Sequence, residues 1–350
     1  MLKIVSQKAQ LRKEPDCGMV KTTSNLRFLI SSLWLLLAVF CSATQAQQPA
    51  KVARVGYLAG VSASADLPRL QAFIQGLREF GYIEGQNIII EYRYSGSDLD
   101  RLPELAAELV AEKPNVLVGV TTNAALAVKK VSGNIPVVFM GVTDPVAAGL
   151  VESLPRPGGN ATGITNMAGI LTGKRLELLK ETVPKLSRLA VLWDPKAPGS
   201  IPQWQESQEP AQELKLHLYS MEVSSVDQYE AAFKEAVNAR NTAIWITLNP
   251  LANSNQKSIA DLAIKHHLPS TCARSDYVEN GCMMAYGPGY SIEGRDGARY
   301  VDKILRGIKP VDIPVEQPMK FEFVINLKTA QQFGIKVPSW TLMKADKVIR

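Results

Sequence analysis

The chain has 350 residues, of which 39 are Lys or Arg and 33 are Asp or Glu, so its formal net charge at pH 7 is +6. This length predicts two folded units, because single hydrophobic cores tend to split beyond about 250–300 residues. Without segment 1–46, 33 basic and 31 acidic residues remain, a net charge of +2. Such a balance argues against a nucleic-acid-binding surface, so we expect no nucleic acid as a partner.

Segment 1–46 has the pattern of a signal peptide. An apolar run, residues 28–41, follows basic residues and precedes a small-residue stretch that ends at Ala46. These are the three parts of a cleaved export signal, and the run is shorter than the about 20 residues that span a membrane. We therefore expect cleavage after Ala46 and a periplasmic protein. A start at Met19 would give a signal of ordinary length, which leaves residues 1–18 open as a start-site extension.

Strands and helices alternate through the first half of the mature chain. Short apolar runs predict strands at 51–58, 87–92, 116–120, 136–140 and 161–165. Helices are predicted at 66–81, with Asp66 as the cap, and at 102–110, 121–131 and 146–154. This strand-helix-strand order is typical of βαβ units with a parallel sheet.

The second half repeats this order. Helices at 172–182, 201–214, 226–239 and 254–266 alternate with strands at 188–193, 215–221, 243–248 and 269–272. A helix at 292–306 follows, then a proline-rich segment, a strand at 320–325 and a last helix at 327–333. The predicted fold class is therefore α/β, with two doubly wound parallel-sheet lobes. Because a segment returns between the halves, we expect crossovers and one hinged body rather than two independent domains.

Patterns that mark common enzyme sites fail in this chain. Segment 169–175 has three residues between its glycines, where a phosphate-binding loop needs four, and no G-x-G-x-x-G follows the first strand. No nucleophile, base and orienting group stand out together. We therefore expect no enzyme and no cofactor. The alternative is an exported α/β enzyme that acts on a small molecule in the cleft between the lobes.

Cys272 and Cys282 are the cysteines that remain without segment 1–46. An even number in an exported protein permits one disulfide, and two buried thiols are the open alternative. Neither cysteine has a further Cys or His at the spacing of a zinc site, so we expect no bound metal.

Polar residues follow the predicted strands, at the edge where open α/β sheets bind their ligands. The helix start at Thr122 favours an anion, and the carboxylate of Asp144 suits a ligand ammonium. The same residue types also form caps and turns, which stays the alternative for each of them. The candidate ligand residues are Ser62, Ser64, Thr122, Asn123, Thr143, Asp144, Asn166, Asp194, Asn249, Arg274 and Tyr286.

Several stretches of the chain resemble one family. They are the run QAFIQGLREFGY at 71–82, segment 144–163 with its RPGGN motif, and segments 300–307 and 314–330. In these stretches the chain resembles the ABC-transporter substrate-binding proteins that include the tryptophan-binding proteins of bacteria. The resemblance covers nearly the whole mature chain. It implies a type I periplasmic-binding-protein fold, with two lobes, three hinge crossovers and a ligand between the lobes.

The resemblance also implies partners and boundaries. We expect a monomeric solute-binding protein that delivers a small polar or amino-acid-like ligand to the membrane permease of an ABC importer, which works with an ATPase. The expected lobes are 47–163 with 288–313 (lobe 1) and 164–287 with 314–350 (lobe 2). The expected crossovers are 155–165, 283–288 and 310–318.

One segment departs from the family pattern. After the strand at 243–248, relatives often carry an acidic residue before a proline and an aromatic residue after it. This chain has Asn249-Pro250-Leu251 there. The missing acid and ring argue against an aromatic amino acid as the ligand.

Overall fold

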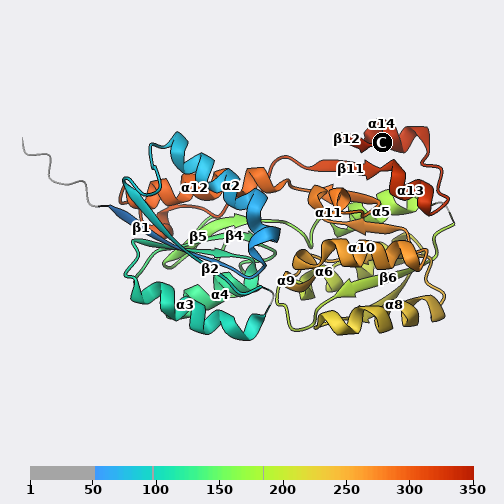
Figure 1. Ribbon diagram of the computed structural model, residues 1–350, viewed down its shortest axis with the longest axis horizontal. Helices are drawn as coiled ribbons and strands as arrows, with labels where there is room; N and C mark the ends of the chain where they lie inside the picture. Colours follow the sequence, from blue (N-terminus) through green and yellow to red (C-terminus); the bar gives the residue numbers. More distant parts are fainter. Residues whose placement is uncertain (1–51, 97, 184) are drawn as a thin grey trace, which may run out of the picture. The chain divides into compact units, whose positions relative to one another are not determined.

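The computed structural model describes residues 52–350, apart from residues 97 and 184 and the side chains of residues 290 and 291. The predicted export signal lies outside the described residues. The described chain forms two sheets, each with helices on both faces (Figure 1). None of its helices has the length and apolar character of a membrane span.

The first sheet has five parallel strands in the order β2-β1-β3-β4-β5. They are β1 (Ala53–Ala59), β2 (Ile88–Tyr94), β3 (Val116–Val120), β4 (Val137–Val142) and β5 (Ala161–Thr165). Helices α2 (Ala63–Glu79) and α12 (Tyr290–Leu305) bury one face of this sheet, and α3 (Leu102–Ala111) and α4 (Thr122–Val131) bury the other. A short 3-10 turn, η1 (Leu99–Arg101), leads into α3.

The second sheet has seven strands in the order β12-β11-β10-β9-β8-β6-β7, with β11 antiparallel to β10. They are β6 (Arg188–Trp193), β7 (His217–Glu222), β8 (Ala243–Ile246), β9 (Ser270–Cys272), β10 (Met284–Gly287), β11 (Glu322–Asn326) and β12 (Lys347–Ile349). One face packs against α8 (Tyr229–Asn238), α10 (Gln256–Lys265) and α11 (Ser275–Glu279). The other packs against α5 (Thr172–Thr182), α7 (Gln208–Glu213) and α13 (Leu327–Gln332).

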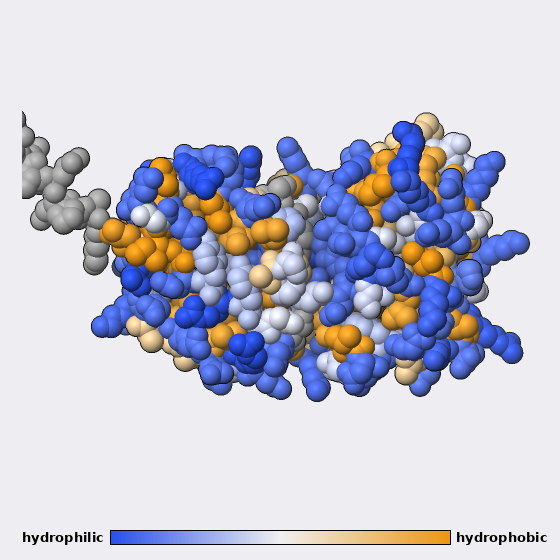
Figure 2. Space-filling view, viewed as in Figure 1, coloured by the Kyte–Doolittle hydropathy of each residue, from blue (hydrophilic) through white to orange (hydrophobic). Residues whose placement is uncertain are grey.

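The remaining short elements are α6 (Ile201–Gln205), α9 (Pro250–Ser254), α14 (Ser339–Lys344), η2 (Val226–Gln228) and η3 (Pro310–Asp312). Most apolar side chains lie in the four cores between sheets and helices. On the face drawn in Figure 2, hydrophilic residues predominate and smaller hydrophobic groups lie between them.

The chain passes between the two sheets after β5, after β10 and after η3. Two of these crossovers lie side by side, because the N–H of Thr165 donates to the Glu316 carbonyl and the N–H of Glu316 donates to the Gly163 carbonyl. Arg299 of α12 binds the Glu316 carboxylate at 2.9 Å, which lowers the pKa of that carboxyl. The predicted lobe boundaries stay predictions.

Arg175 of α5 connects the other crossover to the first. It is fully buried, and its guanidinium donates to the carbonyls of Ala168, after β5, and of Tyr286, in β10. Burial lowers its pKa to about 9, so the guanidinium is still charged at pH 7. One buried cation thus holds the backbone of two crossovers together.

Four sequence predictions are corrected, and the first two concern residues 146–154 and the start of α2. Residues 146–154 form turns instead of a helix, because Gly149 has a φ of +72° and the N–H groups of Leu150 and Val151 both turn back to the Pro145 carbonyl. The N-cap of α2 is Ser62 and not Asp66, which lies fully buried in the first turn.

The helix predicted at 201–214 is divided into two, and the helix predicted at 254–266 starts earlier and is also divided. The first forms α6 and α7, and the second begins as α9 at Pro250 and restarts as α10 after Asn255. Asn255 has a non-helical φ of −124°, and its side-chain amide donates to the Leu251 carbonyl, which ends α9. Strands β10 and β12 and helices α11 and α14 have no counterpart among the predicted elements.

Gly163 provides a test of how closely β5 packs on β4. Its φ is +156°, and an added Cβ would collide with the carbonyl oxygen of Phe139 and lie 2.7 Å from its nitrogen. We expect Gly163→Ala to lower the free energy of unfolding by about 1–3 kcal/mol or more, measured by urea denaturation. The control is Gly159→Ala, whose Cβ would meet Lys129 Nζ at an ordinary 3.5 Å. Equal stability of the two variants would contradict this packing.

Candidate functional site

A cavity lies between the two sheets, where the carboxyl ends of their strands face each other. Its lining comes from the carboxyl ends of β3, β4, β5, β6, β8 and β9, with the loops or helix starts that follow them, and from one side chain of α2. The lining residues are Arg69, Thr121, Thr122, Asn123, Gly141, Thr143, Asn166, Ala197, Gly199, Leu248, Asn249, Pro250, Asn253 and Arg274. This is the edge at which open α/β sheets bind ligands.

The loops of the two lobes touch around this cavity. The N–H of Ser62, in lobe 1, donates to the hydroxyl of Ser254, in lobe 2, at 3.0 Å. Gly199 of lobe 2 lies against two threonines of lobe 1, since an added Cβ would come 2.7 Å from Thr122 Oγ1 and 3.0 Å from Thr143 Oγ1. The enclosed cavity measures about 20 Å³, close to the room of a single water.

Arg69 brings a charge network of lobe 1 to the cavity. Its Nη1 binds Asp66 Oδ1 at 2.6 Å and its Nε binds Glu293 Oε2 at 3.0 Å. The hydroxyl of Tyr57 donates to the other oxygen of Asp66 at 2.6 Å. Burial raises the pKa of Asp66, while Arg69 and Tyr57 act to lower it. Each oxygen of Asp66 thus has a partner, and the guanidinium is fixed in place.

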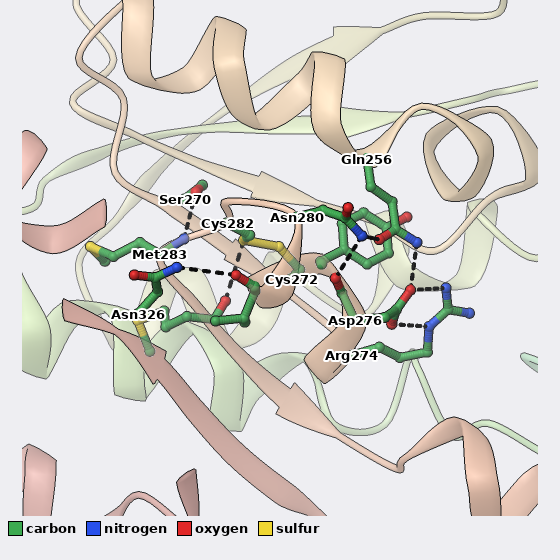
Figure 3. Close-up of a disulfide and its surroundings, with 12 residues drawn as sticks. Gln256, Ser270, Cys272, Arg274, Asp276, Asn280, Cys282, Met283 and Asn326 are labelled. Carbon is green, nitrogen blue, oxygen red and sulfur yellow. Dashed lines mark hydrogen bonds and ion pairs between the residues drawn. A yellow bond between two sulfur atoms is a disulfide. The ribbon is translucent and has the colours of Figure 1, made fainter. Parts of the chain in front are cut away.

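Arg274 is the corresponding cation of lobe 2. Its Nε and Nη2 bind the two oxygens of Asp276 at 3.0 and 3.1 Å (Figure 3). Nη2 also lies 3.3 Å from Asn253 Oδ1. Cys272, two residues before Arg274, is bonded to Cys282, so the open alternative of free thiols is decided in favour of a disulfide. The bridge closes the segment that carries Arg274 and α11.

Gln203 of α6 connects two of the loops that line the cavity. Its amide nitrogen donates to the carbonyls of Gly199 and Leu248 at 2.7 and 2.9 Å, and its oxygen accepts the Leu248 N–H at 2.9 Å. The side chain is fully buried. It therefore fixes the spacing between the loop after β6 and the loop after β8, although it does not itself line the cavity.

Six of the eleven candidate ligand residues line the cavity: Thr122, Asn123, Thr143, Asn166, Asn249 and Arg274. Two of these also have structural roles. Asn249 Oδ1 caps α9 by accepting the Ala252 N–H at 2.8 Å, and the Asn166 amide donates to the Gly141 carbonyl at 2.9 Å.

Five candidates lie elsewhere. Ser62 caps α2, and Ser64 lines a wider groove of about 260 Å³ with Lys257 and Glu279. Asp194 accepts the hydroxyl of Ser224 at 2.6 Å, and the carbonyl of Tyr286 binds Arg175. Contact of these residues with a ligand stays a prediction.

Asp144, the fifth, forms a turn. Its Oδ1 accepts the N–H groups of Val146 and Ala147 at 3.1 and 3.0 Å. Its charge also acts on lobe 2, since the pKa of Glu206 is raised by burial first and by the charge of Asp144 second. The predicted pairing of Asp144 with a ligand ammonium is not tested by these contacts.

Arg69, Thr121 and Asn253 line the cavity although they are not among the residues predicted from the sequence. The helical spacing could have indicated Arg69, because Asp66, Arg69 and Phe73 fall on one face of α2, and this face is buried. Leu251, which was expected to replace a ring at the ligand, packs in a core of lobe 2 and does not line the cavity. In the described part of the chain, no group of three or more His, Cys, Asp or Glu side chains could hold a metal ion.

Comparison with known proteins gives one family. The model of the ABC transporter substrate binding protein family matches residues 54–349. The tyrosine-binding protein of Clostridioides difficile is 26% identical over 281 residues, which are 79% of this chain and 81% of that protein.

Solved structures agree in fold. A conserved domain protein from Vibrio cholerae superposes with a TM-score of 0.81 at 28% identity, covering 85% of this chain and 100% of that one. An ABC domain from Streptococcus pneumoniae in complex with L-Trp gives a TM-score of 0.80 at 26% identity, covering 85% and 99%. The two α/β lobes are therefore those of a type I periplasmic binding protein.

Reduction of the disulfide should destabilise the protein. The bridge joins residues 10 apart in sequence, and closing a loop of this size restricts the unfolded chain. We expect the free energy of unfolding to fall by about 2–4 kcal/mol on reduction, measured by urea denaturation with and without dithiothreitol. A double variant, Cys272→Ala with Cys282→Ala, is the control that reductant should leave unchanged. Two titratable thiols in the oxidised protein would contradict the bridge.

Loss of the Gln203 amide should lower the stability of the folded protein. Gln203→Met keeps the side chain's length but leaves the buried Leu248 N–H and carbonyl without their partners, at a cost of about 1–3 kcal/mol for each unsatisfied group. We expect a lower midpoint in urea. Gln212→Met, on the exposed face of α7, is the matched control and should unfold as the native protein does. If both variants are equally stable, Gln203 does not hold the two loops.

Proposed function

Since the chain belongs to the family of ABC transporter substrate-binding proteins, we propose that it binds a small polar or amino-acid-like ligand in the cavity between its lobes and delivers it to a membrane permease. Members of this family are ligand-binding components of transporters and not enzymes. The alternative of an exported enzyme is therefore set aside.

The observation that carries this proposal is the division of the lining between the lobes. Arg69, Thr122 and Thr143 come from lobe 1, while Gly199, Asn249 and Arg274 come from lobe 2. A ligand in this place would touch both lobes and favour the state in which they are together. Because the closed cavity is so small, the lobes must separate at the crossovers before a ligand can enter.

We propose Thr122, Asn123, Thr143, Asn166, Asn249 and Arg274 as ligand contacts, since each lines the cavity. The names of the relatives support amino acids as the first compounds to test. One is a tyrosine-binding protein, and another was solved with L-Trp. Leu251 no longer argues against an aromatic amino acid, because it belongs to the core.

The cellular setting belongs to the same proposal. The family is extracytoplasmic, and segment 1–46 has the pattern of a cleaved export signal. We propose a monomeric periplasmic protein that presents its closed, loaded form to the permease and the associated ATPase. A ligand-dependent shape is what allows a permease to distinguish loaded from empty protein. No nucleic acid takes part.

Ligand-driven closure is the test of this function. The mature protein, starting at Gln47, is screened by thermal shift against the twenty L-amino acids, small carboxylates and neutral sugars. We expect a compound that raises the melting temperature to reduce the radius of gyration in small-angle scattering, with unchanged helix content by circular dichroism. A saturating compound that leaves the scattering curve unchanged would contradict the clamp.

A further inference from the structure

Asn253 of α9 borders two spaces between the lobes. It lines the central cavity, and it also lines the wider groove with Ser64 and Lys257. The residue is 5% exposed. A side-chain amide in such a place needs donors at its oxygen and acceptors at its nitrogen. The neighbours of Asn253 therefore decide which end of the amide is left for a ligand.

Two donors fix the amide of Asn253. The Tyr277 hydroxyl donates to Asn253 Oδ1 at 2.7 Å, and Arg274 Nη2 lies 3.3 Å from the same oxygen. A guanidinium can donate but cannot accept, so the atom that it contacts must be the oxygen of the amide and not the nitrogen. The partners of Asn253 thus decide its orientation, which the similar shape of the two ends of an amide would otherwise leave open.

The nitrogen is the other end of the same amide. Within the described part of the chain, Asn253 Nδ2 makes no hydrogen bond, while Oδ1 makes two. An amide nitrogen carries two N–H donors, and donors that are nearly buried without an acceptor are costly. The two donors of Asn253 are therefore available to a molecule in the space that this residue lines.

Tyr277 is itself held in place. It is 1% exposed in a core of lobe 2, and the N–H of Cys282 donates to its carbonyl at 2.9 Å. The disulfide from Cys282 to Cys272 closes the segment that contains α11 and Tyr277 (Figure 3). Arg274 also lies over the tyrosine ring, with Cζ 5.6 Å from the ring centre. The hydroxyl therefore contacts Asn253 from a fixed position.

We propose that Asn253 Nδ2 donates a hydrogen bond to an acceptor oxygen of the ligand, and that Tyr277 is the positioning residue that keeps the amide in this orientation. This inference rests on the proposed function and names a further contact of lobe 2. The contact selects for an oxygen on the ligand. A ligand ammonium finds no acceptor here, because two donors already occupy Asn253 Oδ1.

Unfolding in urea without ligand tests the orientation of the amide. Asn253→Asp keeps an oxygen for Tyr277 and Arg274 and removes only the nitrogen, so we expect at least the unfolding midpoint of the native protein. Asn253→Leu leaves both donors without their acceptor and should unfold at a lower urea concentration. If Asn253→Asp loses as much stability as Asn253→Leu, the nitrogen is paired within the fold and the proposal is overturned.

Calorimetry tests the donor. The mature protein and its variants are titrated with L-tyrosine and L-tryptophan. We expect Asn253→Asp to lower the affinity at least about tenfold, because the ligand oxygen then meets an acceptor instead of a donor. Asn134→Asp, at an exposed position before β4, adds the same charge and should keep the affinity. Native affinity in Asn253→Asp would overturn the donor role.

Tyr277→Phe separates the orientation of the amide from the added charge. It removes one hydroxyl and no charge, so we expect the affinity to fall about twofold to tenfold. Tyr229→Phe is the matched control, since Tyr229 is buried in the same core and its hydroxyl makes no hydrogen bond to a lining residue within the described chain. Native affinity in Tyr277→Phe would overturn the positioning role.

The two proposals fail in different ways. If neither amino acid binds the native protein, the proposed function fails for amino acids, and the donor role fails with it. If the native protein binds one of them and Asn253→Asp binds it equally well, the proposed function stands and this inference alone is overturned.

Discussion

The ion pair between Arg69 and Glu293 is the interaction on which the rest of the site depends. Its partners are 224 residues apart in sequence, and it joins α2 to α12, the segment that returns from the second lobe. Both side chains are almost fully buried, and a buried charge is tolerated only with a well-placed partner. The pair therefore keeps the returning helix on lobe 1 and holds a guanidinium at the cavity.

Lobe 2 also holds an arginine at the cavity with an ion pair, but the partner is close in sequence. Arg274 is held by Asp276, two residues further along the chain, and by Asn253 of α9. The nearby disulfide and the Gln203 amide fix the segments on either side. These contacts fix the polar loops before a ligand binds. Less conformational entropy is therefore lost on binding.

Much of the fold could be predicted from the sequence, because apolar periodicity and turn residues act locally. Strands such as Arg188–Trp193 and the helix Thr172–Thr182 have the predicted bounds. The failures have non-local causes. The run at 146–154 has helical apolar spacing, yet the turn at Pro145 and the positive φ of Gly149 prevent a helix. Asp66 has the composition of a cap, but Tyr57 and Arg69 draw it into the core.

The candidate site was predictable where a polar residue directly follows a strand. Thr122, Thr143 and Asn249 were found in this way and line the cavity. Arg69 was not, because it belongs to a helix and reaches the cavity through a fold contact that no local pattern encodes. Thr121 was treated as a cap, since neither its backbone conformation nor its unpaired hydroxyl can be read from residue type. The disulfide was left open because sequence gives pairing possibilities and no distances.

The central claim is that the ligand binds in the cavity between the lobes that Arg69 and Arg274 line. A crystal structure of the mature protein with a compound that raises its melting temperature tests this claim most directly. The account predicts the compound enclosed by Thr122, Thr143, Asn249 and Arg274, in contact with both lobes. A compound bound instead in the outer groove beside Ser64 and Lys257, with the central cavity unchanged, would contradict it.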